Sequence, residues 1–503
     1  MEGPATGPSP PNPSRGAVWA GWGGVLVILG VGLWLRWPAM LAGYTGDEVS
    51  TVAPGGPLRV LRDPEIGVNP PLWRLMFNLF LPEWITPAVG RAFSLVMSAA
   101  AIVLAALLGR EAGRGWWAAG WWAALLVALH PLAIVYGGQF RIYASWMATA
   151  LLLVYAMGRV LEPGAEEPMA TRRWTWAAGI AAVLLPQWHY MGVPALAGVA
   201  LAVLLSRQWR KVWMLLPGLL LVLPYVPAIL SEPARRVEAK VPLGQSFQKI
   251  VALGVSPPKG AVDWFANPHR AWLGEPFHWP TYMTVSMLIL VALHLLLWPW
   301  IGARRRMLAM GAVAVMGGVI AAGQVQYVRE PTMLMMLAFL APLLGALPAA
   351  GWGPLRWAGW LALGWWVFSG IPERQAWYAD RLAERHGPRT FLAEQAFWEE
   401  DRAGGEVWVH PSYTMNILWF YATGTHRRHA PWTEGCAGRG ACVELEGVRY
   451  VGKDVGVEGW GHQGLLVSFE SFPDPSLGEA CEALHEEPGL RVWRCDGREA
   501  PAK

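Results

Sequence analysis

Long runs of apolar residues, separated by short polar stretches, dominate the chain as far as about residue 371. The first run extends from about Ala17 to Trp37 and carries no charge before Arg36. At roughly 20 residues it is long enough to cross a bilayer as a helix. Runs of this kind predict about eleven membrane-spanning helices, at residues 17–37, 91–109, 116–136, 143–160, 174–190, 192–206, 212–230, 281–301, 307–323, 331–349 and 356–371.

Basic residues provide an independent test of this layout, because cytoplasmic loops carry an excess of Lys and Arg. They fall in alternate loops of the predicted layout: Arg15, Arg110, Arg114, Arg159, Arg172, Arg173, Arg207, Arg210, Lys211, Arg304, Arg305, Arg306 and Arg356. We therefore expect the N-terminus inside and everything after Gly370 outside. The predicted fold class is an α-helical polytopic membrane protein, N-in and C-out, with a C-terminal soluble α/β domain.

The composition agrees with this class. Hydrophobic residues make up 54% of the 503 residues and charged residues 15%, against about 25% charge in an average soluble chain. A net charge of +4, with no long run of Lys and Arg, gives nucleic-acid binding no support. The chain divides into a disordered cytoplasmic tail at 1–16, a membrane domain at 17–371 and an extracytoplasmic domain at 372–503.

The C-terminal domain is predicted from an abrupt rise in Glu, Arg, Gly and His. Alternating and helical patterns predict helices and strands in it. The predicted helices are Gln375–Arg402, Ser412–Tyr421 and Leu477–Leu484, and the predicted strands are Glu406–His410, Val448–Val451, Leu465–Phe469 and Leu490–Arg494.

All 4 cysteines lie in this last domain. Four cysteines allow three disulfide connectivities, and closeness in sequence favours Cys436 with Cys442 and Cys481 with Cys495. Disulfides fit an oxidising, extracytoplasmic compartment. A zinc site is the rival interpretation, but no two cysteines have the C-x-x-C spacing that zinc sites commonly use.

Asp47 and Glu48 are adjacent carboxylates placed where the first apolar run ends and water begins. An acidic residue in this position has a structural interpretation as a helix N-cap. The functional interpretation gains weight from the polar residues of later loops predicted on the same side of the membrane. In chain order these are Asn69, Arg91, Arg141, Tyr143, His189, Tyr190, Tyr327 and Arg329.

The order of these motifs resembles the glycosyltransferase C superfamily, in the branch of protein O-mannosyltransferases and the lipid A aminoarabinose transferase. The resemblance covers about 17–371, and the C-terminal domain is similar to the small soluble domain of many bacterial members. It implies an inverting transfer of a sugar from a polyprenyl-phosphate carrier to a protein, lipid A or polysaccharide acceptor. It also implies a multi-pass place in the bacterial inner (cytoplasmic) membrane, among membrane lipids.

The resemblance implies that Asp47 is the general base and that Glu48 orients Asp47 or contacts the acceptor. Arg141 and Arg329 are candidates to bind the donor phosphate by charge-assisted hydrogen bonds, although arginines near a membrane also extend to the interface without function. His189 and Tyr190 can hydrogen-bond a substrate hydroxyl or phosphate, although a lone histidine at a helix end is often structural.

Two positions depart from the family pattern. Asn69 stands near a point where the family often has His or Lys, and Arg329 is followed by Glu330 where the family commonly has Tyr. No clear Asp-x-Asp motif lies on the predicted outer side, so we expect activity without a metal ion or other cofactor.

Alternatives from other classes remain. A secondary transporter or flippase would place paired charges in the middle of interrupted helices, whereas the acidic pair here lies at a span boundary. A non-catalytic envelope scaffold would instead use the C-terminal domain to bind a partner.

Overall fold

The computed structural model describes most of the predicted membrane domain and the strands of the C-terminal segment. The described residues are 14–41, 87–161, 168–226, 303–323, 330–347, 357, 360, 406–410, 442–445, 448–452, 463–468, 481–487 and 490–496. The predicted span at 281–301, most of the span at 356–371 and the first outer loop lie outside them. The number of eleven spans and the domain boundaries therefore stay predictions.

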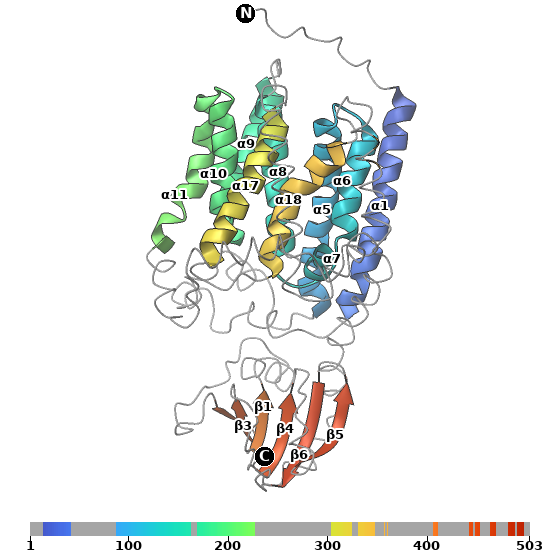
Figure 1. Ribbon diagram of the computed structural model, residues 1–503, viewed down its shortest axis with the longest axis vertical. Coiled ribbons are helices and arrows are strands. Elements are labelled where there is room, and N and C mark those ends of the chain that lie inside the picture. Colours follow the sequence, from blue (N-terminus) through green and yellow to red (C-terminus); the bar gives the residue numbers. More distant parts are fainter. Residues whose placement is uncertain are drawn as a thin grey trace, which may run out of the picture.

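The described helices gather in one bundle, and the strands form a separate sheet (Figure 1). The helices are α1 (Arg15–Leu41), α5 (Pro87–Ala112), α6 (Trp117–Leu129), α7 (Pro131–Gly137), α8 (Tyr143–Leu161), α9 (Pro168–Trp188), α10 (Gly192–Leu205), α11 (Leu216–Leu220), α17 (Ala303–Gly323) and α18 (Glu330–Ala346), with 3₁₀ turns η2 (Trp209–Leu215) and η3 (Leu223–Tyr225). Within the described part of the chain, three helices (α1, α5 and α8) are long and apolar enough to cross a membrane.

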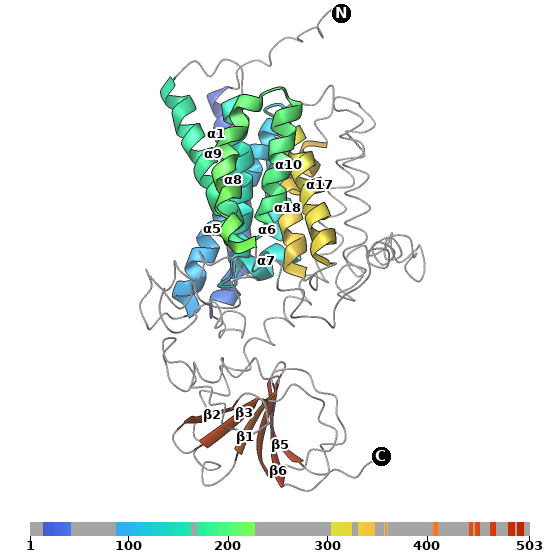
Figure 2. The same ribbon diagram turned by 90° about the vertical axis from the view of Figure 1, so that its left-hand side faces the viewer.

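Helix α8 lies among the other helices of the bundle (Figure 2), and α1 lies at the edge of the bundle (Figure 1). In its most apolar stretch 89% of α8 is buried, against 22% of α1. The outer surface of α1 exposes large apolar side chains such as Trp19, Val27 and Trp34. Apolar side chains directed away from the protein are typical of a helix that faces lipid, since lipid tails are as apolar as the side chains.

Small residues bring α5 and α6 into close contact. A Cβ added at Gly120 would lie 2.5 Å from the carbonyl oxygen of Ala106, and one added at Gly109 would lie 2.7 Å from that of Ala119. Close approach through small residues is a common way for helices to associate in a membrane, where van der Waals packing takes the place of the hydrophobic effect.

The span predicted as one helix at 116–136 is two helices, and that prediction was wrong in this respect. His130 is extended, at φ −65° and ψ 126°, between α6 and α7. The residue before a proline is disfavoured in the helical region, and Pro131 therefore ends α6 and begins α7. Helix α7 contacts α1, α5, α6, α8 and α18.

The span predicted at 212–230 was also wrong as a continuous helix. The described part of this segment is the 3₁₀ turn η2, the short helix α11 and the 3₁₀ turn η3. Pro217 and Pro224 stand near the starts of α11 and η3. Proline lacks the N–H that a helix interior requires, and repeated prolines divide the segment.

The C-terminal strands form a six-stranded sheet in the order β2-β3-β1-β4-β6-β5. They are β1 (Glu406–His410), β2 (Cys442–Leu445), β3 (Val448–Gly452), β4 (Gln463–Ser468), β5 (Cys481–Glu487) and β6 (Leu490–Asp496). Strand β1 is parallel to both β3 and β4, and the remaining pairs are antiparallel. The four strands predicted from the sequence are present. The helices predicted at Gln375–Arg402 and Ser412–Tyr421 lie outside the described residues.

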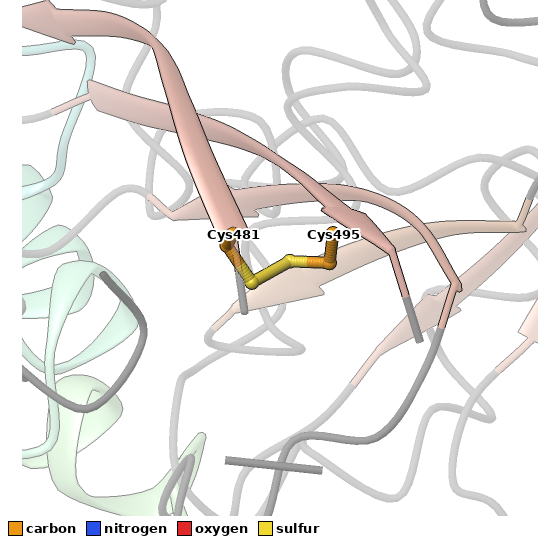
Figure 3. The surroundings of a disulfide bond; sticks show 2 residues. All are labelled: Cys481 and Cys495. Atoms are coloured by element: carbon orange, nitrogen blue, oxygen red, sulfur yellow. A yellow bond between two sulfur atoms is a disulfide. The ribbon is translucent and has the colours of Figure 1, made fainter. Parts of the chain in front are cut away.

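The helix predicted at Leu477–Leu484 was wrong over its described part, where strand β5 begins. Glu482, Ala483 and Leu484 favour helices locally, but β5 pairs along its length with β6. Cys481 lies directly opposite Cys495 in this pairing, and the two form a disulfide (Figure 3). Tertiary pairing and the disulfide thus override local helix propensity.

Candidate active site

Arg141, Tyr143 and His189 come from separate motifs in the sequence and meet in the structure. The Arg141 guanidinium carbon lies 5.9 Å from the centre of the Tyr143 ring, and the Tyr143 and His189 rings are 6.4 Å apart at their centres. Arg141 precedes α8, Tyr143 begins α8, and His189 follows α9. The structure therefore places a guanidinium, a phenol and an imidazole together at one end of the bundle.

Close backbone contacts fix the hairpin that carries Arg141. Ser98 Oγ donates a hydrogen bond to the carbonyl of Gly137 at 3.2 Å, and Ser94 Oγ donates to the carbonyl of Arg141 at 3.4 Å. A Cβ added at Gly138 would lie 2.7 Å from the Cβ of Ala39. Glycine is required here because the hairpin lies against the end of α1, while the serines of α5 hold its carbonyls.

His189 is neutral and has a defined tautomer. The backbone N–H of Met191 donates a hydrogen bond to Nδ1 at 3.1 Å, so the ring proton is on Nε2. Burial of the ring, and then the charge of Arg141, lower the pKa of His189 from 6.5 to about 4. At neutral pH the imidazole can therefore donate from Nε2 without adding a charge.

Tyr190 follows His189 and faces a second tyrosine. Its ring centre is 6.4 Å from that of Tyr225. Burial, and then the neighbouring Tyr225, raise the pKa of Tyr190 above its usual value of 10.0. The Tyr190 hydroxyl thus stays protonated at neutral pH and can donate a hydrogen bond.

Arg91 lies at the same end of the bundle and binds the end of α1. It is fully buried, and Nη1 donates a hydrogen bond to the carbonyl of Ala39 at 2.5 Å. The last turn of a helix leaves its carbonyls without intrahelical partners, and Arg91 fills one of these positions. The chain then continues from Leu41 toward Asp47.

Arg36 is a structurally important residue that the sequence interpretation did not assign to the site. It is fully buried and donates hydrogen bonds to the carbonyls of Gly32 at 2.7 Å, Ala128 at 3.0 Å and Val127 at 3.1 Å. The carbonyls of residues 127 and 128 belong to the last turn of α6, which ends early at Pro131. An arginine inside an apolar span was the available signal, because charges within membrane helices are rare unless they have a role.

Asp47, Glu48, Asn69, Tyr327 and Arg329 lie outside the described residues. Their predicted loops leave from described helix ends. Helix α1 runs toward Asp47, and α18 begins at Glu330, directly after Arg329. The far end of α18 packs at Gly345 against Ala119 and Ala123 near the start of α6, so α18 begins at the end of the bundle where α1 finishes. Over the described residues, no group of three His, Cys, Asp or Glu side chains is close enough to hold a metal ion.

Comparison with known proteins gives a likeness in overall structure only. No protein-family model matches the sequence, and no curated protein matches it. The crystal structure of ArnT from Cupriavidus metallidurans in the apo state is 15% identical and matches with a TM-score of 0.37 over 95% of this chain and 98% of that chain. The structure of ArnT from Cupriavidus metallidurans bound to undecaprenyl phosphate is 16% identical, with a TM-score of 0.36 over 96% of this chain and 98% of that chain. At these TM-scores we draw no conclusion about function from the likeness.

Proposed function

We propose that this chain is an inverting membrane glycosyltransferase that moves a sugar from a polyprenyl-phosphate carrier to an extracytoplasmic acceptor. The observation that carries the proposal is the grouping of Arg141, Tyr143 and His189 at the end of the bundle toward which α1 leads. The motif order in the sequence supports it as well. The acceptor is a protein, lipid A or a glycan.

The grouped side chains have the chemistry that a lipid-linked phosphate requires. The guanidinium of Arg141 supplies a permanent positive charge and a planar set of donors that fits phosphate oxygens. The neutral His189 adds a donor at Nε2, and the protonated Tyr190 adds a hydroxyl. A phosphate held at the boundary between lipid and water needs both charge neutralisation and several donors, and this end of the bundle offers them.

The proposed reaction is a single displacement at the anomeric carbon. Asp47 accepts the proton of the acceptor hydroxyl or amine as the acceptor atom forms its bond to the anomeric carbon. The bond between that carbon and the phosphate oxygen breaks, and the carrier leaves as polyprenyl phosphate with the bonding electrons. Arg141 stabilises the charge that develops on this leaving phosphate. Attack and departure on opposite faces of the sugar invert the anomeric configuration.

The experiment is transfer from a panel of radiolabelled polyprenyl-phosphate sugars by the purified full chain. Loss of a general base typically costs about 10²–10⁴-fold in rate, so Asp47→Asn should lose transfer by about that factor and still bind donor. Arg141→Lys keeps the charge but loses the planar pair of donors, so its affinity for donor should fall. Arg172→Lys is the matched control, because Arg172 is an exposed arginine on the basic side of the predicted layout.

Full transfer by Asp47→Asn would contradict the assignment of the base. Absence of transfer from every donor by the wild-type chain would contradict the enzyme. In that case, movement of the labelled lipid between leaflets without transfer would instead favour a flippase.

A further inference from the structure

A buried ionic cluster lies at the end of the bundle opposite the candidate active site. It joins the end of α5, the end of α8 and the start of α17. The Glu111 carboxylate binds Arg159 Nη2 at 2.5 Å through Oε1 and Arg304 Nε at 2.6 Å through Oε2. The side chain of Glu111 is 12% exposed. One carboxylate therefore already bridges two arginines in this cluster.

Arg305 adds a further positive charge beside this bridge. Its Nε donates a hydrogen bond to the carbonyl of Ala112 at 2.6 Å. Its Nη2 is buried and has no hydrogen-bond partner among the described residues. Burial, and then repulsion from Arg114, lower the pKa of Arg305 below its usual value. A buried guanidinium nitrogen without an acceptor is costly, so this position favours an anion.

Tryptophans mark the depth of the cluster in the membrane. Arg110 lies 4.4 Å from the centre of the Trp117 ring, and the rings of Trp116 and Trp360 are 5.4 Å apart. Tryptophan is enriched at the level of lipid headgroups. At the level of the headgroups, phospholipid phosphates are the anions present at the highest density.

We propose that Arg114 and Arg305 form a binding site for the phosphate of an anionic phospholipid, bridging the end of α5 and the start of α17. Arg305 lies in the first turn of α17, and Arg114 lies just after the end of α5. The lipid phosphate accepts from Arg305 Nη2 and offsets the repulsion between Arg305 and Arg114. Bound lipid thus holds α17 against α5. The site is independent of the proposed transfer reaction.

The test measures the melting temperature of the full chain in detergent as lipid is added. Phosphatidylglycerol should raise it in a saturable way, and phosphatidylcholine, which has no net charge, should not. A basic residue near the surface contributes about a fivefold change in binding to anionic lipid. Arg305→Gln and Arg114→Asn should therefore each weaken the apparent affinity for phosphatidylglycerol by about fivefold.

The variants are chosen to separate binding from folding. Arg114 is exposed and has a φ of 58°, a conformation that asparagine tolerates, so Arg114→Asn should fold normally. The control Arg172→Gln removes an exposed charge from α9 outside the cluster and should leave the affinity unchanged. An equal loss in Arg172→Gln, or no loss in either cluster variant, would overturn the proposal. Equal stabilisation by inorganic phosphate alone would also overturn it in favour of a solute site.

Discussion

His189 shows how one hydrogen bond and burial set the chemistry of a site residue. With Nδ1 accepting from the N–H of Met191, protonation of the ring would break this contact and place a charge beside Arg141. The fold therefore resists protonation. A neutral histidine can donate a hydrogen bond to a phosphate. Because it carries no positive charge, it does not repel the neighbouring arginine.

The free energy of unfolding should consequently fall as the pH drops from about 6.5 to about 4. In this window the unfolded chain binds a proton at His189 that the folded chain does not, so acid favours unfolding. At roughly 1.4 kcal/mol per pKa unit, lowering the pKa from 6.5 to about 4 contributes at most about 3.5 kcal/mol. Above pH 6.5 the histidine is neutral in both states and contributes no pH dependence.

Denaturation midpoints of the wild type and His189→Asn, measured between pH 4 and pH 7.5, isolate this contribution. Asparagine places a carbonyl oxygen near the position of Nδ1, so it can still accept from Met191, and it does not titrate. The variant should be less sensitive to acid than the wild type. Parallel pH curves for the two proteins would contradict the assignment.

Arg36 and Arg91 hold the end of α1 in place through hydrogen bonds. Both are fully buried, and both donate hydrogen bonds to backbone carbonyls. Arg36 binds carbonyls at the end of α6, and Arg91 joins α5 to the carbonyl of Ala39. Together they fix the last turns of α1, so the segment that continues to Asp47 leaves from a defined position.

At the scale of elements, the contact between α5 and α6 depends on the absence of side chains. Gly120→Ala should be strongly destabilising, because its Cβ would lie 2.5 Å from the carbonyl of Ala106 on the facing helix. A clash with backbone atoms at that distance can be relieved only by moving the two helices apart. Overpacking of this kind typically costs about 1–3 kcal/mol.

Gly179→Ala is the matched control for this prediction. A Cβ at Gly179, within α9, would meet nothing within 4 Å, and alanine favours a helix over glycine by up to about 1 kcal/mol. This variant should melt at the wild-type temperature or slightly above it, measured by the loss of helical circular dichroism. Equal melting temperatures for the two alanine variants would show that α5 and α6 are less closely packed than the structure indicates.

The elements predicted best from the sequence are the helices that form from long local runs of apolar residues. The run from Ala17 to Trp37 corresponds to α1 and the run at 143–160 to α8, because long apolar runs have few alternatives in a bilayer. To predict the break at His130, the helix-breaking effect of Pro131 has to be given more weight than the apolar run that surrounds it. Strand β5 could not be predicted from its own residues, since its pairing with β6 lies in another segment.

The candidate site was predictable only in part for a related reason. Arg141 and His189 stood out as polar residues between apolar spans, and the structure brings them together with Tyr143. Sequence spacing alone contained no information on the distance between them, which depends on how α8 and α9 pack. Arg36 was noted only as the first charge of its apolar run. An arginine near a span end can extend to the interface, whereas the Arg36 side chain is buried against the end of α6.

At the scale of the whole molecule, the basic residues and the disulfide give two separate indications of which side of the membrane each part occupies. The ionic cluster of Glu111, Arg159 and Arg304 lies at the opposite end of the bundle from Arg141 and His189. By the excess of basic residues, the cluster end is expected to be cytoplasmic. A disulfide such as that between Cys481 and Cys495 is typical of an oxidising compartment, so the two expectations agree if the sheet lies outside.

This agreement yields a prediction for labelling in spheroplasts with a membrane-impermeant maleimide. Cys481 and Cys495 should react in intact spheroplasts only after reduction, whereas a cysteine introduced by Arg172→Cys should react only after the membrane is opened. The double variant Cys481→Ser, Cys495→Ser serves as the background for the other two cysteines. It should also be less stable by about 3 kcal/mol, since the bond closes a loop with a sequence separation of 14 residues. If both positions react in intact spheroplasts, or if neither does before lysis, the sheet and the basic segment that contains Arg172 lie on the same side of the membrane. The N-in, C-out arrangement would then be wrong, and the carboxylates of Asp47 and Glu48 would have to be placed again relative to the basic loops.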